Sequence, residues 1–367
     1  MRSIIVKNKK IIFKLFTLFF ISLVSGFLGY KLGLNFKQVL AICVFLFSIG
    51  GTLFFWNFRL SFAFLGTSIL LISSTINLED LIKSSSLEVI LFLVGMMILI
   101  GLLKYSGFFA WLVMFVLRIK NLNSFKFFIY ICVFSAILAC AVDEVTSIIF
   151  MIAAILQICD FFEISPVPFI IISVLTTNIG SSGTVLGNPI GIIIATRAKL
   201  TFEDFILNAF PIMLACLVLT MFLLFFYYRS YLKEFNKKIK EFGKNEIFLK
   251  LISVPPDRNL RISLVIFLFS LFFIALHHRL ELLLNLEVNT ILLVVPLFFS
   301  AIVMVWKHKE ARYFVETDVE WWTLLFFLFL FVQVGALKST GVIDIFAEKI
   351  SLLAGQKYYI LNAVILW

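Results

Sequence analysis

Two neighbouring carboxylates, Asp143 and Glu144, lie in the segment AVDEVTS, and Thr146 follows them. Apolar runs flank this segment, so it would lie at membrane depth if the flanking residues form the two arms of a hairpin. Burial in hydrocarbon and mutual repulsion both favour the protonated form of at least one carboxylate. A proton and a metal cation could then compete for the same oxygens. We interpret the segment as a cation or proton site.

A second polar stretch, TTNIGSSGTVLGNP at 176–189, separates the apolar runs VPFIIISVL and IGIIIA. A helix that starts near Pro168 loses its pattern around Asn178. It resumes after Asn188, a good N-cap, and Pro189, which needs no N–H in the first turn. Such a break leaves main-chain groups that only a ligand or a water-filled cavity can satisfy in hydrocarbon. The carbonyl end suits a small hard cation, whereas the new helix start suits an anion.

Simpler interpretations stay open for both segments. Asp143 could cap the returning helix while both acids reach water near an interface. The glycine-rich stretch could be a kink packed against neighbouring helices. Two polar breaks close together in an apolar chain favour an ion site. The predicted ion-binding residues are Asp143, Glu144, Thr146, Thr177, Asn178, Gly180, Ser181, Thr184, Gly187, Asn188 and Pro189.

The composition indicates which kind of protein holds these segments. Of 367 residues, 62% are hydrophobic and 14% are charged, and the mean hydropathy is +1.10, as expected for an all-α polytopic membrane protein. Apolar runs long enough for spans lie near 11–30, 39–56, 60–76, 87–103, 168–196, 209–228, 260–276, 288–306 and 321–337. All five cysteines fall in apolar runs without CxxC spacing, so we expect buried helix residues and no redox role.

Loop charges set the expected orientation. We place the N-terminus in the cytoplasm, treat 127–160 as a re-entrant hairpin, and lay 106–120 along the interface. Most Lys and Arg residues then fall on the cytoplasmic side of the inner membrane. Arms that crossed fully would leave this orientation unchanged, because two crossings cancel. The net charge of +10 lies in short loops and does not indicate a nucleic-acid partner.

An internal repeat supports re-entrance. LEVILFLVGMMILIGLLKYSG, at 87–107, aligns without gaps to WWTLLFFLFLFVQVGALKSTG, at 321–341, and the two copies share a GxLKxxG ending. In the expected topology the copies start on opposite sides of the membrane, as in inverted-repeat secondary transporters. The second copy reaches Trp367 near the place where a second acidic hairpin should occur. We therefore expect a truncated product or a partial chain, whose complete relatives carry roughly 90 more residues.

The expected organisation has five parts. N-terminal scaffold helices occupy 1–86, and the first inverted repeat occupies 87–228, with its hairpin at 127–160 and its broken helix at 168–196. A cytoplasmic linker follows at 229–259. Further scaffold helices at 260–318 precede the incomplete second repeat at 319–367.

The segments AVDEVTSIIFMIAAI and PVPFIIISVLTTNIGSSGTVLGNPIGIIIATRAKLTFEDF resemble the paired signature of the ion transporter superfamily. The likeness is to its arsenite-permease and NhaD-type sodium/proton antiporter branch, which is citrate-transporter-like and reads FLDNVTT at the hairpin and NIGGxATxIGDPPN at the broken helix. The resemblance implies a scaffold domain and a mobile transport domain with two hairpins and two broken helices. The matching residues are Asp143, Thr146, Asn178, Gly180, Thr184, Gly187 and Pro189.

Departures from the branch concern acidity. Glu144 stands where the branch usually has Asn, and Asn188 replaces an Asp. Ile190 and Gly191 replace Pro-Asn. The acidic groups therefore move from the broken helix to the hairpin, so the ion preference of the branch does not simply carry over.

These features together predict a secondary transporter that exchanges sodium for protons. An anion permease for arsenite, a dicarboxylate or a citrate-like solute is the alternative, and a nonfunctional truncated remnant is another. No GxGD, HExxH or GxSxG motif occurs, and the three histidines fall in or beside loops, so we expect no enzyme and no catalytic residue. We expect no cofactor, no metal beyond transported Na⁺, a small ion or anion as substrate, and the lipid bilayer as surroundings. A homodimer stays open.

Overall fold

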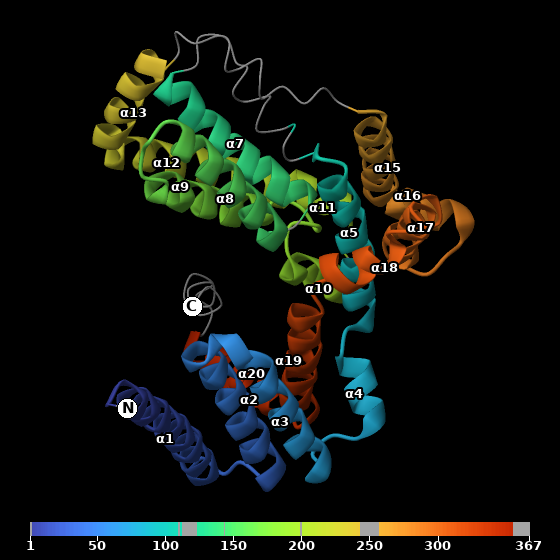
Figure 1. Cartoon of the computed structure of the whole chain (residues 1–367). Coiled ribbons are helices and arrows are strands. Elements are labelled where there is room, and N and C mark those ends of the chain that lie inside the picture. The colour runs from blue at the N-terminus through green and yellow to red at the C-terminus, as the bar shows by residue number, and fades with distance from the viewer. Residues whose placement is uncertain are drawn as a thin grey trace. The chain divides into compact units, whose positions relative to one another are not determined.

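The computed structural model describes residues 2–108, 111, 123–142, 144–198, 200–242 and 257–354. These residues form helices joined by turns, and no strand occurs among them. Eight of the described helices are long and apolar enough to cross a bilayer. The prediction of an all-α polytopic membrane protein is therefore confirmed. The chain forms two compact units, one of residues 1–90 with 320–367 and the other of residues 91–319 (Figure 1).

The first unit joins the N-terminal helices to a helix from the far end of the chain. Its helices are α1 (Arg2–Lys31), α2 (Phe36–Phe54), α3 (Arg59–Ile72), α4 (Leu78–Ser84), α19 (Trp321–Ser339) and α20 (Val342–Ala354). Helix α19 packs against α2, α3 and α4. Gln333 of α19 is fully buried and donates from Nε2 to the main-chain oxygen of Ala63, 3.0 Å away. Such bonds hold helices together in lipid, where apolar attraction between helices is weak.

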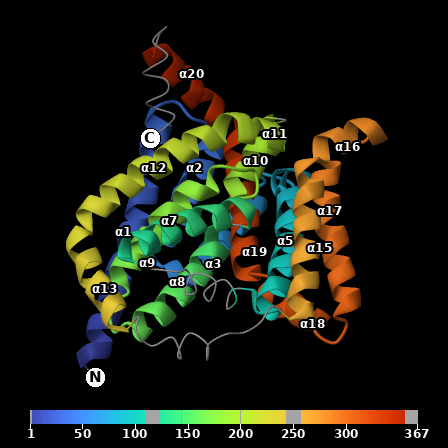
Figure 2. The same cartoon turned by 90° about the horizontal axis from the view of Figure 1, so that it is seen from above.

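The second unit holds the polar segments. Its helices are α5 (Leu87–Tyr105, whose first residues belong to the other unit), α7 (Ser124–Ala141), α8 (Glu144–Phe161), α9 (Val167–Ser181), α10 (Pro189–Ala198), α11 (Phe202–Asp204), α12 (Phe210–Tyr227), α13 (Arg229–Phe242), α15 (Arg258–Ala275), α16 (His277–Leu284), α17 (Thr290–Trp306) and α18 (Ala311–Tyr313). Helices α7, α8 and α9 form a bundle, with α12 beside α9 (Figures 1 and 2). A capping side chain determines where α7 begins. Asn123 caps α7 by accepting from the Lys126 N–H at 2.8 Å.

Many large apolar side chains remain exposed on these helices. On α12 they include Phe222, Leu223 and Phe226, each more than half exposed. A water-soluble protein rarely exposes a continuous apolar surface of this kind, whereas a lipid-facing helix requires one. The exposed faces therefore agree with spanning helices.

The repeat extends to the residues that contact its helices. The alignment that pairs Gly101 with Gly335 also pairs Ser84 with Asp318. A Cβ on Gly101 would lie 2.7–2.9 Å from the Asp318 side chain, and a Cβ on Gly335 would collide with the Ser84 side chain. Each copy's helix is thus closely approached by the residue that precedes the other copy's helix. Each of these close approaches lies within one unit, and paired contact positions of this kind agree with an internal sequence repeat.

Two details differ from the expectations. Cys216 is exposed on α12, and Cys43 and Cys140 are only partly buried, because the apolar faces of their helices are not all turned inward. His277 lies within α16 and is buried. Its Nδ1 lies 2.9 Å from the Ile274 carbonyl oxygen, so the ring has a polar partner there. The described residues of the expected linker at 229–259 include the helix α13, and the assignment of this range as a linker stays a prediction.

Candidate functional site

The acidic hairpin is formed by α7 and α8. Helix α7 ends at Ala141, where the Val142 N–H donates to the Leu138 carbonyl, and α8 begins at Glu144. Asp143 lies outside the described residues, so Glu144 is the carboxylate whose surroundings can be traced. Each arm has 18 residues, which corresponds to about 27 Å of helix. Either arm is long enough to cross a bilayer, so re-entrance stays a prediction.

The broken helix is formed by α9 and α10, with residues 182–188 between them. Asn188 joins the two ends. Its Oδ1 accepts from the Gly191 N–H at 2.7 Å, and its Nδ2 donates to the Ser181 carbonyl at 3.1 Å. A Cβ on Gly187 would collide with the Ser181 main chain. The chain therefore closes tightly over the carbonyl end of α9 before α10 begins.

The hairpin and the broken helix contact each other directly. Ser181 Oγ donates to Glu144 Oε2 at 3.3 Å, and Thr184 Oγ1 donates to the Cys140 carbonyl at 2.5 Å. Gly180 is also essential to this approach, because a Cβ there would collide with the Ala136 main chain. The two polar segments thus form one cluster around the start of α8, although Glu144 and Ser181 are 37 residues apart in the sequence.

Two hydroxyls near this cluster lack partners. Ser147 Oγ and Thr177 Oγ1 are fully buried and form no hydrogen bond with any described residue. Ser147 lies one turn beyond Glu144 on α8, and Thr177 lies one turn before Ser181 on α9. Since α8 and α9 run in opposite directions, both hydroxyls lie on the helix faces joined by the contact between Ser181 and Glu144. Leaving a polar group buried without a partner costs about 1–3 kcal/mol, so these oxygens are suited to a ligand.

Not every predicted residue joins the cluster. The side chain of Asn178 is exposed, although its carbonyl accepts from Ser181 Oγ at 2.9 Å. Thr146 lies two residues after Glu144 and so on a different side of α8. Pro189 starts α10 as expected. Ser147 is a residue that the sequence interpretation missed, and its spacing of three from Glu144 is the signal that could have identified it.

Further polar side chains lie between α7 and α9. Ser135 Oγ and Ser173 Oγ are buried and lie 2.9 Å apart, and Cys140 Sγ lies 3.0 Å from the Gly180 carbonyl. No group of three or more His, Cys, Asp or Glu residues with metal-binding geometry occurs among the described residues. The donor set of the cluster is therefore hydroxyl, carbonyl and carboxylate oxygen, which suits hard monovalent or divalent cations.

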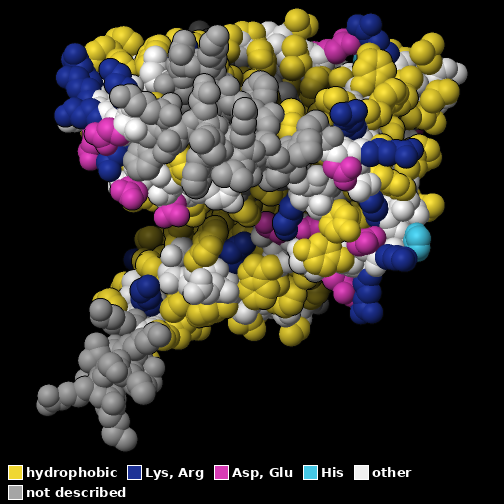
Figure 3. Space-filling view, turned by 45° about the horizontal axis from the view of Figure 1, so that its top comes forward, with side chains coloured by type: hydrophobic (Ala, Val, Ile, Leu, Met, Phe, Trp, Pro, Cys, Tyr) yellow, Lys and Arg dark blue, Asp and Glu magenta, His cyan; other side chains and the backbone are white. Residues whose placement is uncertain are grey.

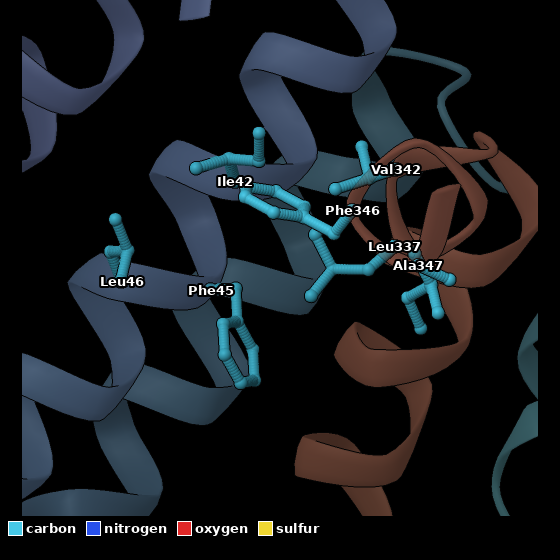
Figure 4. Close-up of a pocket in the computed structure, with 8 residues that line it drawn as sticks. Ile42, Phe45, Leu46, Leu337, Val342, Phe346 and Ala347 are labelled. Carbon is cyan, nitrogen blue, oxygen red and sulfur yellow. The ribbon is translucent and has the colours of Figure 1, made fainter. Parts of the chain in front are cut away.

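The first unit has a hollow of a different kind. It has a volume of about 420 Å³ and is lined by apolar side chains of α2, α19 and α20, among them Phe45, Leu337 and Phe346 (Figure 4). Because the described residues that line it are all apolar, it does not suit an ion. The oxygen-rich cluster between α8 and α9 remains the candidate site.

The model of the CitMHS family, described as citrate transporter, matches residues 52–367. The chain belongs to this family. It is thus a multi-pass membrane protein of a transporter family, and nothing in the match indicates an enzyme.

Several curated relatives are similar to this chain, and the first of them is named a transporter. An uncharacterized transporter of Mycobacterium tuberculosis is 29% identical over 268 residues, which cover 73% of this chain and 60% of that protein. The magnetosome protein MamN of Magnetospirillum gryphiswaldense is 27% identical over 283 residues, or 74% of this chain and 60% of that protein. The human P protein is 27% identical over 124 residues, 34% of this chain and 15% of that protein. The chain thus spans about 60% of the length of the first of these relatives.

Proposed function

We propose that the protein is a secondary active transporter that exchanges sodium for protons, and that Glu144 and Asp143 at the hairpin tip bind both ions in turn. The contact between Glu144 and Ser181 carries this proposal, because it brings a carboxylate to the carbonyl end of a broken helix. Half-helix ends with unwound carbonyls are the usual cation ligands in inverted-repeat transporters.

The cluster offers enough oxygens for a sodium ion. Glu144 supplies a carboxylate, Ser181 and Thr177 supply hydroxyls, and the turn after α9 supplies main-chain carbonyls. Ser147 adds a further buried hydroxyl. When the carboxylate is ionised, its charge and these dipoles favour the cation. Protonation removes that charge, so a proton displaces the cation without any change in the other ligands.

Exchange then requires that this site face one side of the membrane at a time. We assign this movement to the first inverted repeat, residues 87–228, which carries both the hairpin and the broken helix. The remaining helices at 1–86 and 260–318 form the scaffold, and residues 319–367 begin the second repeat. A sodium ion or a proton shifts the population between the outward and inward states only when its affinity for the two states differs.

Flux measurements test this proposal. Liposomes containing the protein and a pH-sensitive dye should show proton movement when Na⁺ is added, and the variants Glu144→Gln and Asp143→Asn should each abolish it. Asp160→Asn, an exposed carboxylate on the same helix α8, should keep the flux. Unchanged exchange in both tip variants would remove these carboxylates from the mechanism. A folded protein without any flux would favour a nonfunctional remnant.

The family description favours a second candidate, a carrier of a citrate-like anion. The anion would bind at the start of α10. However, Pro189 has no N–H and the Gly191 N–H is occupied by the Asn188 side chain, so few donors remain there. The geometry thus favours the cation. Uptake of labelled citrate that does not depend on Glu144 would instead favour the anion carrier.

Orientation and membrane are part of the same proposal. We place the N-terminus in the cytoplasm and the protein in the inner membrane, because most Lys and Arg residues then lie in cytoplasmic loops. Reporter fusions after α2, near residue 57, and after α13 test the assignment. Both should report the cytoplasmic side, whereas a periplasmic signal from either would reverse it.

A further inference from the structure

Helix α13 packs across one end of the hairpin bundle. Its residue Phe235 is fully buried, and the Phe235 ring lies 5.0–5.3 Å, centroid to centroid, from the rings of Phe127, Phe162 and Phe169. These partners lie at the start of α7, just after α8, and at the start of α9. Figures 1 and 2 show α13 beside those ends in both views. The apolar face of α13 is therefore covered by protein and is not free to insert into lipid.

Polar contacts fix α13 on the bundle as well. Asn236 Oδ1 accepts from the Ser124 N–H at 3.3 Å, at the start of α7. Tyr231 donates its phenol proton to the Ser165 carbonyl at 2.5 Å, between α8 and α9. Burial raises the pKa of the Tyr231 phenol, so it stays a neutral donor at physiological pH. Helix α13 is thus in contact with both arms of the hairpin and with the start of α9.

The exposed side of α13 carries a basic stripe, which we define as Arg229, Lys233, Lys237 and Lys240. All four side chains are exposed, and their spacing of four, four and three places them in one row along the helix. None of them forms an ion pair with a described residue. Glu234 and Glu241 border the stripe, each within one turn of Lys237, and neither forms an ion pair with it. Figure 3 shows Lys and Arg side chains gathered on the side of the molecule that carries α13.

The position of the stripe along the chain indicates its partner. The span α12 ends at Tyr227, which is 80% exposed, and Arg229 follows two residues later. Tyrosines are enriched at the headgroup level of a membrane. The exposed apolar face of α12 runs up to this level. The stripe therefore begins at the depth of the phospholipid phosphates, where four unpaired cations meet negative charge.

We infer that α13 binds anionic phospholipid headgroups through the basic stripe, and that this binding holds the end of the hairpin bundle at the surface of one leaflet. The attraction is electrostatic, because the apolar face of the helix is already covered. Each cation near an anionic surface contributes roughly a fivefold preference, so the stripe as a whole favours anionic over zwitterionic lipid strongly. The inference does not depend on which ion is transported.

Hydrogen–deuterium exchange in nanodiscs tests this inference. The purified protein is placed in phosphatidylcholine alone or with one quarter phosphatidylglycerol, and exchange is followed in peptides covering 229–242. Phosphatidylglycerol should slow this exchange severalfold, and 0.5 M salt should reverse the effect. The variant Arg229→Gln/Lys233→Gln/Lys237→Gln/Lys240→Gln should show no response to phosphatidylglycerol.

A matched control separates the stripe from net charge. It is the variant Arg258→Gln/Arg261→Gln/Lys309→Gln/Arg312→Gln, which loses four exposed cations that the expected topology places on the same side, and it should respond like the wild type. An equal response in all three proteins, or none in the wild type, would overturn the inference. If the wild type does not respond to phosphatidylglycerol, an acidic protein becomes the expected partner of the stripe. If the stripe variant does not fold, Lys233→Gln/Lys237→Gln should lose about half of the response.

Discussion

The adjacent residues Thr176 and Thr177 allow a sharp test of the ion site. Both side chains are fully buried on α9. Thr176 Oγ1 donates to the Ile172 and Ser173 carbonyls of its own helix, at 2.9 and 3.1 Å, whereas Thr177 Oγ1 has no partner among the described residues. Valine has nearly the shape of threonine, so Thr→Val removes the hydroxyl and little else.

The two substitutions should therefore differ in their effect on the free energy of unfolding and in their response to sodium. Without sodium, Thr177→Val should raise the free energy of unfolding, because it removes an unpaired buried oxygen that costs about 1–3 kcal/mol. Sodium at about 100 times its dissociation constant should stabilise the wild type by about 2.7 kcal/mol. This gain should fall sharply in Thr177→Val, since loss of a ligand oxygen weakens binding by about 10- to 100-fold.

Thermal unfolding in detergent, with sodium varied against choline at constant ionic strength, measures both effects. Thr176→Val should unfold at nearly the wild-type temperature and keep the full sodium response. The reasoning would be refuted if Thr177→Val were destabilised in sodium-free buffer and still gained as much from sodium as the wild type. In that case the unpaired hydroxyl would not be a ligand.

Three further substitutions have defined outcomes. Gly180→Ala should destabilise the protein by about 1–3 kcal/mol or more, because its Cβ meets the Ala136 main chain, and a thermal melt would show this. Gln333→Leu should change stability by less than about 1 kcal/mol, because the lost interhelical bond is offset by removal of the unpaired, buried Oε1. Burial raises the pKa of Tyr231, so its stabilising protonated form is present below the unfolded pKa of about 10 and is lost as pH rises above it. Between pH 10 and pH 11, urea titrations should accordingly show a steeper loss of stability in the wild type than in Tyr231→Phe, with about 10 as the onset.

Local chemistry in the sequence determined the helices and their ends. Apolar runs of span length can only be helices in lipid, because each main-chain group must be paired within its own segment. The break between α9 and α10 was predictable for the same kind of reason, since Asn188 is an N-cap and Pro189 suits a first turn. The carboxylate at the start of α8 was also evident. These features depend on residues that are close together in the chain.

Tertiary packing decided which of these polar groups meet. The contact of Ser181 with Glu144 depends on how α9 lies against both arms of the hairpin, where Gly180 packs closely on Ala136 of α7, and no local pattern encodes this register. The Ser147 hydroxyl has no hydrogen-bond partner among the described residues, and it lacks one only because the packing of α8 buries it away from water. Likewise, the charges on α13 were evident in the sequence, whereas the Phe235 contacts decided which side of the helix is left exposed. Side-chain register between distant helices is a sum of many weak contacts, so only the folded structure could determine it.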